Sequence, residues 1–139
     1  MSRPSTLLPS LLPTLLLDTT VLIDALRNRN QRRRLLAGLV ASGMALATST
    51  VNIAEVFAGL RPGEEQATRA FLAGLDLVPV SAAIAERAGQ LKAAFMRAGQ
   101  TRSIADMIVG ATAIENGFPV ATDNRRDFQI PGLALFPLP

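Results

Sequence analysis

The sequence predicts a single α/β domain in which helices cover both faces of a parallel sheet. Three observations support this fold class. The length of 139 residues suits one domain with its own core, and a hydrophobic content of 49% argues against disorder. Short apolar runs alternate along the chain with longer segments of helical periodicity, as in βαβ units. No internal repeat, low-complexity tract or long linker divides the chain.

The first half of the chain predicts two strands and four helices. The strands are short apolar runs, and the helices repeat apolar residues at helical spacing. Arg61-Pro62-Gly63 ends the third helix. The predicted strands are Thr14–Leu17 and Met44–Thr48, and the predicted helices are Thr19–Arg27, Gln31–Ala41, Thr50–Leu60 and Glu64–Leu75.

The second half predicts two long helices and up to three short strands. Gly99 follows the first of these helices, and Gly117 stands where a helix-ending glycine is expected after the second. The helices are Ser81–Ala98 and Ser103–Asn116, and the strands are Leu77–Val80, Pro119–Thr122 and Leu133–Phe136.

The composition excludes several kinds of catalytic site. The chain contains no Cys, His, Trp or Tyr. Thiol nucleophiles, Ser-His-Asp triads, histidine bases and Cys/His zinc sites are therefore ruled out. Carboxylates are the main remaining candidates, either as acid and base or as ligands of a hard divalent metal.

The basic residues are almost all arginine, since Lys92 is the only lysine. The net charge is +3 and the sequence pI is near 11.0. Because guanidinium groups suit phosphate oxygens, this composition is compatible with a polyanionic partner. A soluble, arginine-rich surface explains it equally well.

Residues 1–13 are expected to be a flexible lead-in to the first strand. Pro9 and Pro13 interrupt their apolar stretch, which is too short to span a bilayer and precedes no small-residue cleavage site. We therefore expect no membrane association. The absence of cysteine fits a reducing compartment, so the expected location is the cytoplasm.

Three carboxylates stand alone on apolar segments. Asp18 follows three leucines, Glu55 is the only ionisable residue between positions 44 and 60, and Asp106 is the only one between 103 and 114. An unpaired buried carboxylate is costly, so an arginine, backbone N–H groups or a metal should compensate each of them. Each also has a simpler explanation. Asp18 suits a helix N-cap, Asp106 a capping box with Ser103, and Glu55 a solvent contact or a pair with Arg61.

A fourth polar group lies in "VATDNRRDF", after the strand predicted at 119–122. It offers Thr122, Asp123, Asn124 and Asp127 within a few residues. An Asx-type turn with solvated charges would explain it without any function. Because parallel strands end at a common edge, however, the four acidic segments are expected to meet there.

The segments "LLLDTTVLID", "STVNIAEVFAG", "SIADMIVGATA" and "ATDNRRDF" resemble, in this order, the motifs of PIN domains. The chain is most similar to single-domain bacterial VapC-type toxins of type II VapBC toxin–antitoxin pairs, from about Leu15 to Phe136. The resemblance implies a three-layer α/β/α sandwich with a short parallel sheet. It also implies an endoribonuclease that depends on Mg²⁺ or Mn²⁺ to cleave RNA phosphodiester bonds.

The resemblance also assigns functions to residues. It makes Asp18 and Asp106 the principal metal ligands and Glu55 a further catalytic acid. The fourth acid is either Asp123 or Asp127, because Asn124 stands where the family usually has an acid; the match to Asp127-Phe128 favours Asp127. The supporting polar residues would be Thr19, Ser49, Asn52, Thr122 and Asn124.

The implied partners are an RNA (tRNA, rRNA or mRNA), a cognate antitoxin and a second copy of the chain. Arginines near the expected site are candidates for RNA phosphate contacts, although the run at 32–34 also suits a solvated helix face. An alternative function is a catalytically weak PIN domain within a protein–DNA regulatory complex, which Asn124 favours. The candidate RNA-binding residues are Arg27, Arg32, Arg33, Arg34, Arg102, Arg125 and Arg126.

Overall fold

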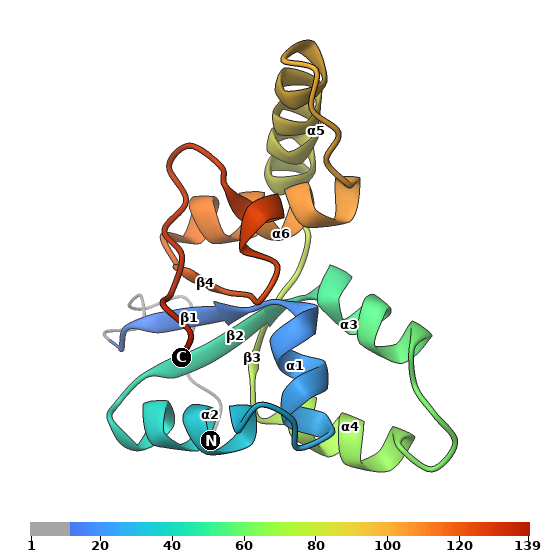
Figure 1. Cartoon of the computed structure of the whole chain (residues 1–139), viewed down its shortest axis with the longest axis vertical. Coiled ribbons are helices and arrows are strands. Elements are labelled where there is room, and N and C mark those ends of the chain that lie inside the picture. Colours follow the sequence, from blue (N-terminus) through green and yellow to red (C-terminus); the bar gives the residue numbers. More distant parts are fainter. Residues whose placement is uncertain (1–11) are drawn as a thin grey trace.

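A four-stranded parallel sheet lies at the centre of the computed structural model, which describes residues 12–139 (Figure 1). The predicted lead-in over residues 1–13 therefore lies outside the described residues, except for Leu12 and Pro13. Within the described part of the chain, no helix is long and apolar enough to cross a membrane.

The sheet explains why the first strand is entirely apolar. β1 is an inner strand, and its Leu16 lies opposite Ala47 on one side and Val120 on the other. All four of its residues are buried, as expected for a strand covered on both faces. The spatial order is β3 (Asp76–Val78), β2 (Ala45–Ser49), β1 (Thr14–Leu17) and β4 (Val120–Ala121), and every pairing is parallel.

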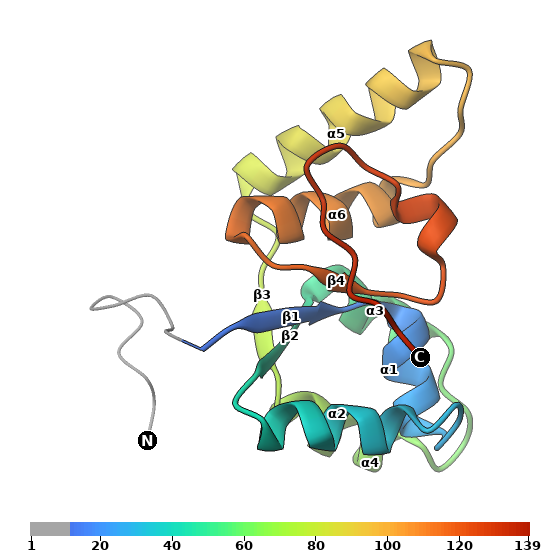
Figure 2. The same ribbon diagram turned by 60° about the vertical axis from the view of Figure 1, so that its left-hand side comes forward.

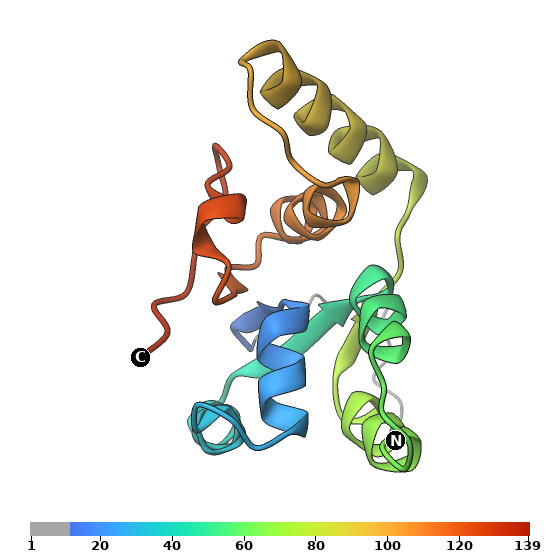
Figure 3. The same cartoon turned by 45° about the vertical axis from the view of Figure 1, so that its right-hand side comes forward.

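Helices cover the two faces of this sheet, which confirms the predicted α/β/α layering. Figures 2 and 3 show α5 and α6 on one face and α1, α2 and α4 on the other, with α5 projecting beyond the strands. The helices are α1 (Thr19–Leu26), α2 (Arg32–Ala41), α3 (Thr50–Ala58), α4 (Glu65–Ala73), α5 (Ala82–Arg97) and α6 (Ile104–Asn116).

Two hydrophobic clusters hold the layers together. Side chains alternate between the faces of a strand, so Leu16 packs with α5 and α6, whereas Leu15 and Leu17 pack with α1 and α2. α3 contributes to both clusters, through Val51 on the α6 side and Val56 on the α1 side. It thereby closes the sheet at the edge where the strands end.

The largest differences from the sequence prediction lie at the C-terminus. No strand forms over 133–136; Leu135 makes a single parallel bridge to Val120, because β4 offers only two residues for pairing. A 3₁₀ helix, η1 (Arg125–Phe128), forms where an Asx-type turn was the simple alternative. The third strand, expected at 77–80, begins one residue earlier and ends at Val78.

Candidate active site

Three strand ends bring polar side chains to one edge of the sheet. Asp18 follows β1, Ser49 ends β2 and Thr122 follows β4, and all three are buried. The backbone N–H of Asp18 donates to the carbonyl of Ala121 over 3.0 Å, which fixes β1 and β4 in register. This is the edge at which parallel α/β proteins commonly bind ligands.

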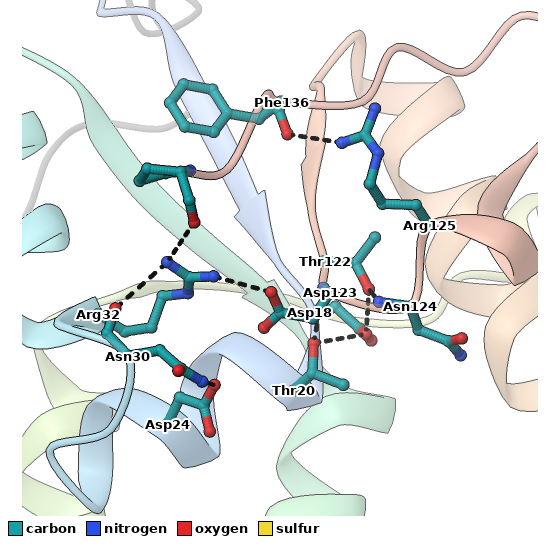
Figure 4. Close-up of polar contacts among 11 residues, drawn as sticks. Asp18, Thr20, Asp24, Asn30, Arg32, Thr122, Asp123, Asn124, Arg125 and Phe136 are labelled. Carbon is teal, nitrogen blue, oxygen red and sulfur yellow. Dashed lines mark hydrogen bonds and ion pairs between the residues drawn. The ribbon is translucent and has the colours of Figure 1, made fainter.

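Asp18 is a buried carboxylate held by hydrogen bonds. Thr122 Oγ1 donates to Asp18 Oδ2 over 2.8 Å, and Thr20 Oγ1 makes a longer contact of 3.4 Å with the same oxygen (Figure 4). The side-chain amide of Asn52 donates to Asp18 Oδ1, also over 3.4 Å. Burial raises the pKa of Asp18, and hydrogen bonds led by that of Thr122 lower it in part. Asp18 occupies the N-cap position of α1, but its side chain makes no well-formed capping hydrogen bond, and the backbone N–H groups of Thr19 and Thr20 lower its pKa less than burial raises it. Helix capping therefore does not explain this residue.

The start of α3 links Asp18 to Glu55. Ser49 and Asn52 form a capping box, with Asn52 N donating to Ser49 Oγ and Ser49 N to Asn52 Oδ1, each over 3.2 Å. The amide group of Asn52 remains available and donates to Thr19 Oγ1 over 3.0 Å. Thr19 Oγ1 in turn donates to Glu55 Oε1 over 2.7 Å. A continuous chain of hydrogen bonds thus runs from one carboxylate to the other.

Asp106 lies in the first turn of α6, and its carboxylate is close to the other acids. Ser103 Oγ caps the helix by accepting from Asp106 N over 3.0 Å, which gives half of the expected capping box. Burial is the main cause that raises the pKa of Asp106, and a hydrogen bond with Ser103 lowers it. The charges of Asp18, Asp127 and Glu55 raise it further. The cap formed by Ser103 therefore does not compensate the repulsion between Asp106 and the other three acids.

The carboxylate oxygens at this site are ligands that suit a hard divalent cation. None of the ion pairs found among residues 12–139 includes Asp18, Glu55, Asp106 or Asp127. Within the same range, no three acidic side chains stand close enough together to hold a metal as they are. Mg²⁺ commonly takes only one or two carboxylates and keeps several water ligands. Two of the four carboxylates would therefore suffice for such an ion.

The two candidates for the fourth acid, Asp123 and Asp127, have different surroundings. Asp123 Oδ1 accepts a hydrogen bond from Arg32 Nη2 over 2.8 Å and turns toward α2 (Figure 4). Asp127, on η1, instead approaches Asp106 closely enough to raise its pKa. Asn124 donates its backbone N–H to Thr122 Oγ1 over 2.9 Å, so it orders the turn between them. Because the charge of Asp123 is already paired with Arg32, Asp127 stays the favoured candidate for the fourth acid.

Most of the candidate RNA-binding arginines are engaged within the chain. Arg27 pairs with Glu64, and Arg32, only 4% exposed, bonds Asp123 and the carbonyl of Pro139. Arg33 donates to carbonyls at the end of α1, and Arg125 donates to the carbonyl of Phe136. These four side chains hold elements together. Arg34 is exposed on α2, whereas Arg102 and Arg126 line a cavity that also contains Asp127.

Comparisons with known proteins agree with this geometry. The profile of the PIN domain family matches residues 15–132. The chain belongs to the PIN domain family. As a PIN domain it is 32% identical over 113 residues to ribonuclease VapC19 of Mycobacterium tuberculosis, covering 81% of this chain and 90% of that protein.

Solved structures share the architecture of this PIN domain. A toxin–antitoxin complex from Klebsiella pneumoniae matches with a TM-score of 0.71 and 30% identity, over 86% of this chain and 95% of that one. VapBC2 from Rickettsia felis, bound to a DNA fragment from its promoter, matches with a TM-score of 0.77 and 24% identity. That match covers 88% of this chain and 97% of the other and supports the fold.

Proposed function

We propose that this PIN domain is a metal-dependent endoribonuclease that cleaves RNA phosphodiester bonds as the toxin of a toxin–antitoxin pair. The observation that carries the proposal is that the charges of Asp18, Glu55 and Asp127 all raise the pKa of Asp106, while none of these four acids belongs to an ion pair of the described residues. Membership of the PIN family and the identity to a ribonuclease support cleavage of RNA.

In this proposal Asp18 and Asp106 hold Mg²⁺ or Mn²⁺, because a cation would relieve the cost of the burial that raises the pKa of both carboxyl groups. The bound ion would lower the pKa of a water molecule and neutralise charge that develops on the phosphate. Thr122 and Asn52 keep the Asp18 oxygens in place, since both donate to them. Buried hydrogen bonds of this kind orient metal ligands.

Glu55 and Asp127 have the remaining catalytic assignments. Glu55 is exposed and is oriented by Thr19, so it can accept a proton from an attacking water. With no histidine in the chain, a carboxylate is the natural group for this step. Asp127 lies between the acidic group and the neighbouring cavity, where it can orient the RNA backbone or a water molecule.

The proposed partners follow from the similar complexes. The Klebsiella and Rickettsia structures contain toxins together with antitoxins, so we propose a cognate antitoxin for this chain as well. The homodimer is proposed from the resemblance to VapC-type toxins alone. A second candidate function is a catalytically weak PIN domain in a DNA-bound regulatory complex. Asn124 favours it, because the fourth motif has lost its usual acid. Asp127 argues against it. This acid belongs to the same motif as Asn124, and its charge raises the pKa of Asp106.

A cleavage assay distinguishes the two functions. Purified, antitoxin-free protein is incubated with total tRNA and rRNA in the presence of Mg²⁺, Mn²⁺ or EDTA. Asp18→Asn and Asp106→Asn are compared with Glu86→Gln, which removes one exposed charge on α5. We expect discrete, metal-dependent cuts that both aspartate variants lose and Glu86→Gln retains. Cleavage that survives EDTA or either aspartate substitution would contradict the mechanism, and a folded protein that cuts nothing would favour the regulatory function.

A further inference from the structure

A large cavity lies beside the acidic group. This cavity of about 1010 Å³ is bounded by the end of α5, the loop that connects it to α6, and η1. Its lining includes Phe95, Arg102, Asn124, Arg126 and Gln129, and it shares Asp127 with the carboxylate group. The volume is at the upper end of the range of small-ligand sites, so it can hold a nucleotide. Anything bound there lies next to the proposed point of cleavage.

Arg102 is held in the cavity as a flat platform. Its guanidinium carbon lies 4.5 Å from the centroid of the Phe95 ring. Arg102 Nη2 donates to Gln100 Oε1 over 3.1 Å, and Lys92 Nζ donates to the carbonyl of Arg102 over 2.5 Å. These contacts fix both the backbone and the plane of the side chain. Within the described residues, Arg102 Nε is buried and has no hydrogen-bond partner.

A planar cation stacked on an aromatic ring suits a nucleobase. Arginine planes and aromatic rings are the usual platforms for unpaired RNA bases, and because this chain has no Trp or Tyr, only its Arg and Phe side chains can provide one. Arg126 is exposed at the same cavity and can reach a phosphate, while the amides of Asn124 and Gln129 can bond base edges. A protein segment fits less well, because the lining is mainly polar and offers few apolar pockets for anchor residues.

We propose that this cavity binds one nucleotide of single-stranded RNA beside the cleaved bond, with its base stacked on Arg102 and a phosphate at Arg126. The inference rests on the proposed ribonuclease function and specifies its substrate: the RNA must be unpaired at the nucleotide next to the cut. Double-stranded RNA would keep its bases paired and could not place one on the guanidinium plane.

Binding measurements in EDTA test the cavity separately from cleavage. The probe is a short, fluorescein-labelled single-stranded RNA, with fluorescence anisotropy as the readout at several salt concentrations. The variants are Arg102→Ala, Arg102→Lys and Arg126→Ala. The matched control is Arg69→Ala on α4, which also removes one charge and one arginine–phenylalanine contact, since Arg69 lies 5.5 Å from the centroid of Phe57. Circular dichroism verifies that each variant is folded.

Substitutions of Arg102 and of Arg126 should weaken RNA binding in different ways. We expect Arg102→Ala and Arg102→Lys each to raise Kd about tenfold, because both remove the planar platform. Arg102→Lys should leave the salt dependence unchanged, since it keeps the charge. Arg126→Ala should reduce the slope of log Kd against log salt by about 0.7, the value for one phosphate contact to a single strand. The Arg69→Ala control should bind like the wild type.

Several outcomes would overturn the proposal. Binding by Arg102→Lys equal to that of the wild type would show that the platform is not used. Equal affinity of the wild type for a fully paired duplex would overturn the requirement for an unpaired base. If the wild type cleaves RNA but the Arg102 variants bind RNA as tightly as Arg69→Ala does, the cavity is rejected as the binding site and the nuclease function stands. A wild type that neither binds nor cuts RNA would instead reject the proposed function.

Discussion

Asp106 carries a cost that only a function explains. A carboxylate in the first turn of a helix gains from the helix dipole. The raised pKa of Asp106 nevertheless shows that burial and the charges of Asp18, Asp127 and Glu55 outweigh this gain. Removing the charge should therefore stabilise the metal-free protein. Activity and stability oppose each other at this residue, as is common at catalytic sites.

We predict that Asp106→Asn melts roughly 2 to 5 °C above the wild type in EDTA near neutral pH. A raised folded pKa means that the unfolded chain loses its proton first, so the penalty develops as pH rises from about 4 through the folded pKa. The difference in melting temperature should then shrink on acidification. Differential scanning fluorimetry measures it, with Glu86→Gln as the control. A lower melting temperature for Asp106→Asn at neutral pH would contradict the repulsion described here.

Mg²⁺ should reverse the order of the two melting temperatures, so that the wild type melts above Asp106→Asn. A ligand that binds only the folded state raises the melting temperature, and Asp106 is one of its two proposed ligands. We therefore expect Mg²⁺ to stabilise the wild type clearly and Asp106→Asn little. If both proteins respond equally to Mg²⁺, Asp106 is not a metal ligand in this chain.

At the scale of elements, Arg32 connects α2 to the turn after β4. Its side chain is buried and bonds Asp123 Oδ1 at 2.8 Å and the carbonyl of Pro139 at 3.4 Å. The backbone N–H of Asp123 donates to Thr20 Oγ1 over 3.2 Å, and Thr20 also donates to Asp18 (Figure 4). Arg32 is thus a positioning residue, because it acts on the site only through this turn.

We predict that Arg32→Met costs about 1 to 3 kcal/mol of unfolding free energy, since it leaves Asp123 and the Pro139 carbonyl without their donor. Arg34→Met on the same helix, where the side chain is exposed, should cost little. Urea denaturation measures both. In the double variant Arg32→Met/Asp123→Asn, part of the loss should be recovered, because no unpaired charge remains. Strictly additive losses would show that the ion pair is unimportant.

The sequence predicted the elements better than the contacts between them. β1 coincides with its expected bounds, because an apolar run ended by Asp18 has few alternatives. η1 and the single bridge at Leu135 depend on how the C-terminal segment packs on β4, which no local pattern contains. The carboxylates were identifiable because each stands alone on an apolar element. The arginines available to RNA could not be identified from the sequence, since the fold decides which of them form ion pairs or bond the carbonyls at a helix end.

At the scale of the whole molecule, the core and the site meet at η1. Phe128 is fully buried in the cluster beneath α5 and α6, and the charge of its neighbour Asp127 raises the pKa of Asp106. Packing of one side chain thereby sets the position of a catalytic candidate. Phe71 offers a comparison, since it packs against the other cluster, on the opposite face of the sheet.

We predict that Phe128→Leu and Phe71→Leu differ in activity more than in stability. Replacing a buried phenylalanine by leucine should cost about 1 to 2 kcal/mol, with the smaller loss at the half-buried Phe71. Both proteins should remain folded at room temperature. Only Phe128→Leu should lower the cleavage rate beyond its folded fraction, because the smaller side chain lets η1 shift and moves Asp127 away from Asp106. Thermal denaturation and single-turnover cleavage of the same preparations measure the two effects. Equal activities at equal folded fractions would mean that η1 does not depend on Phe128 to hold Asp127.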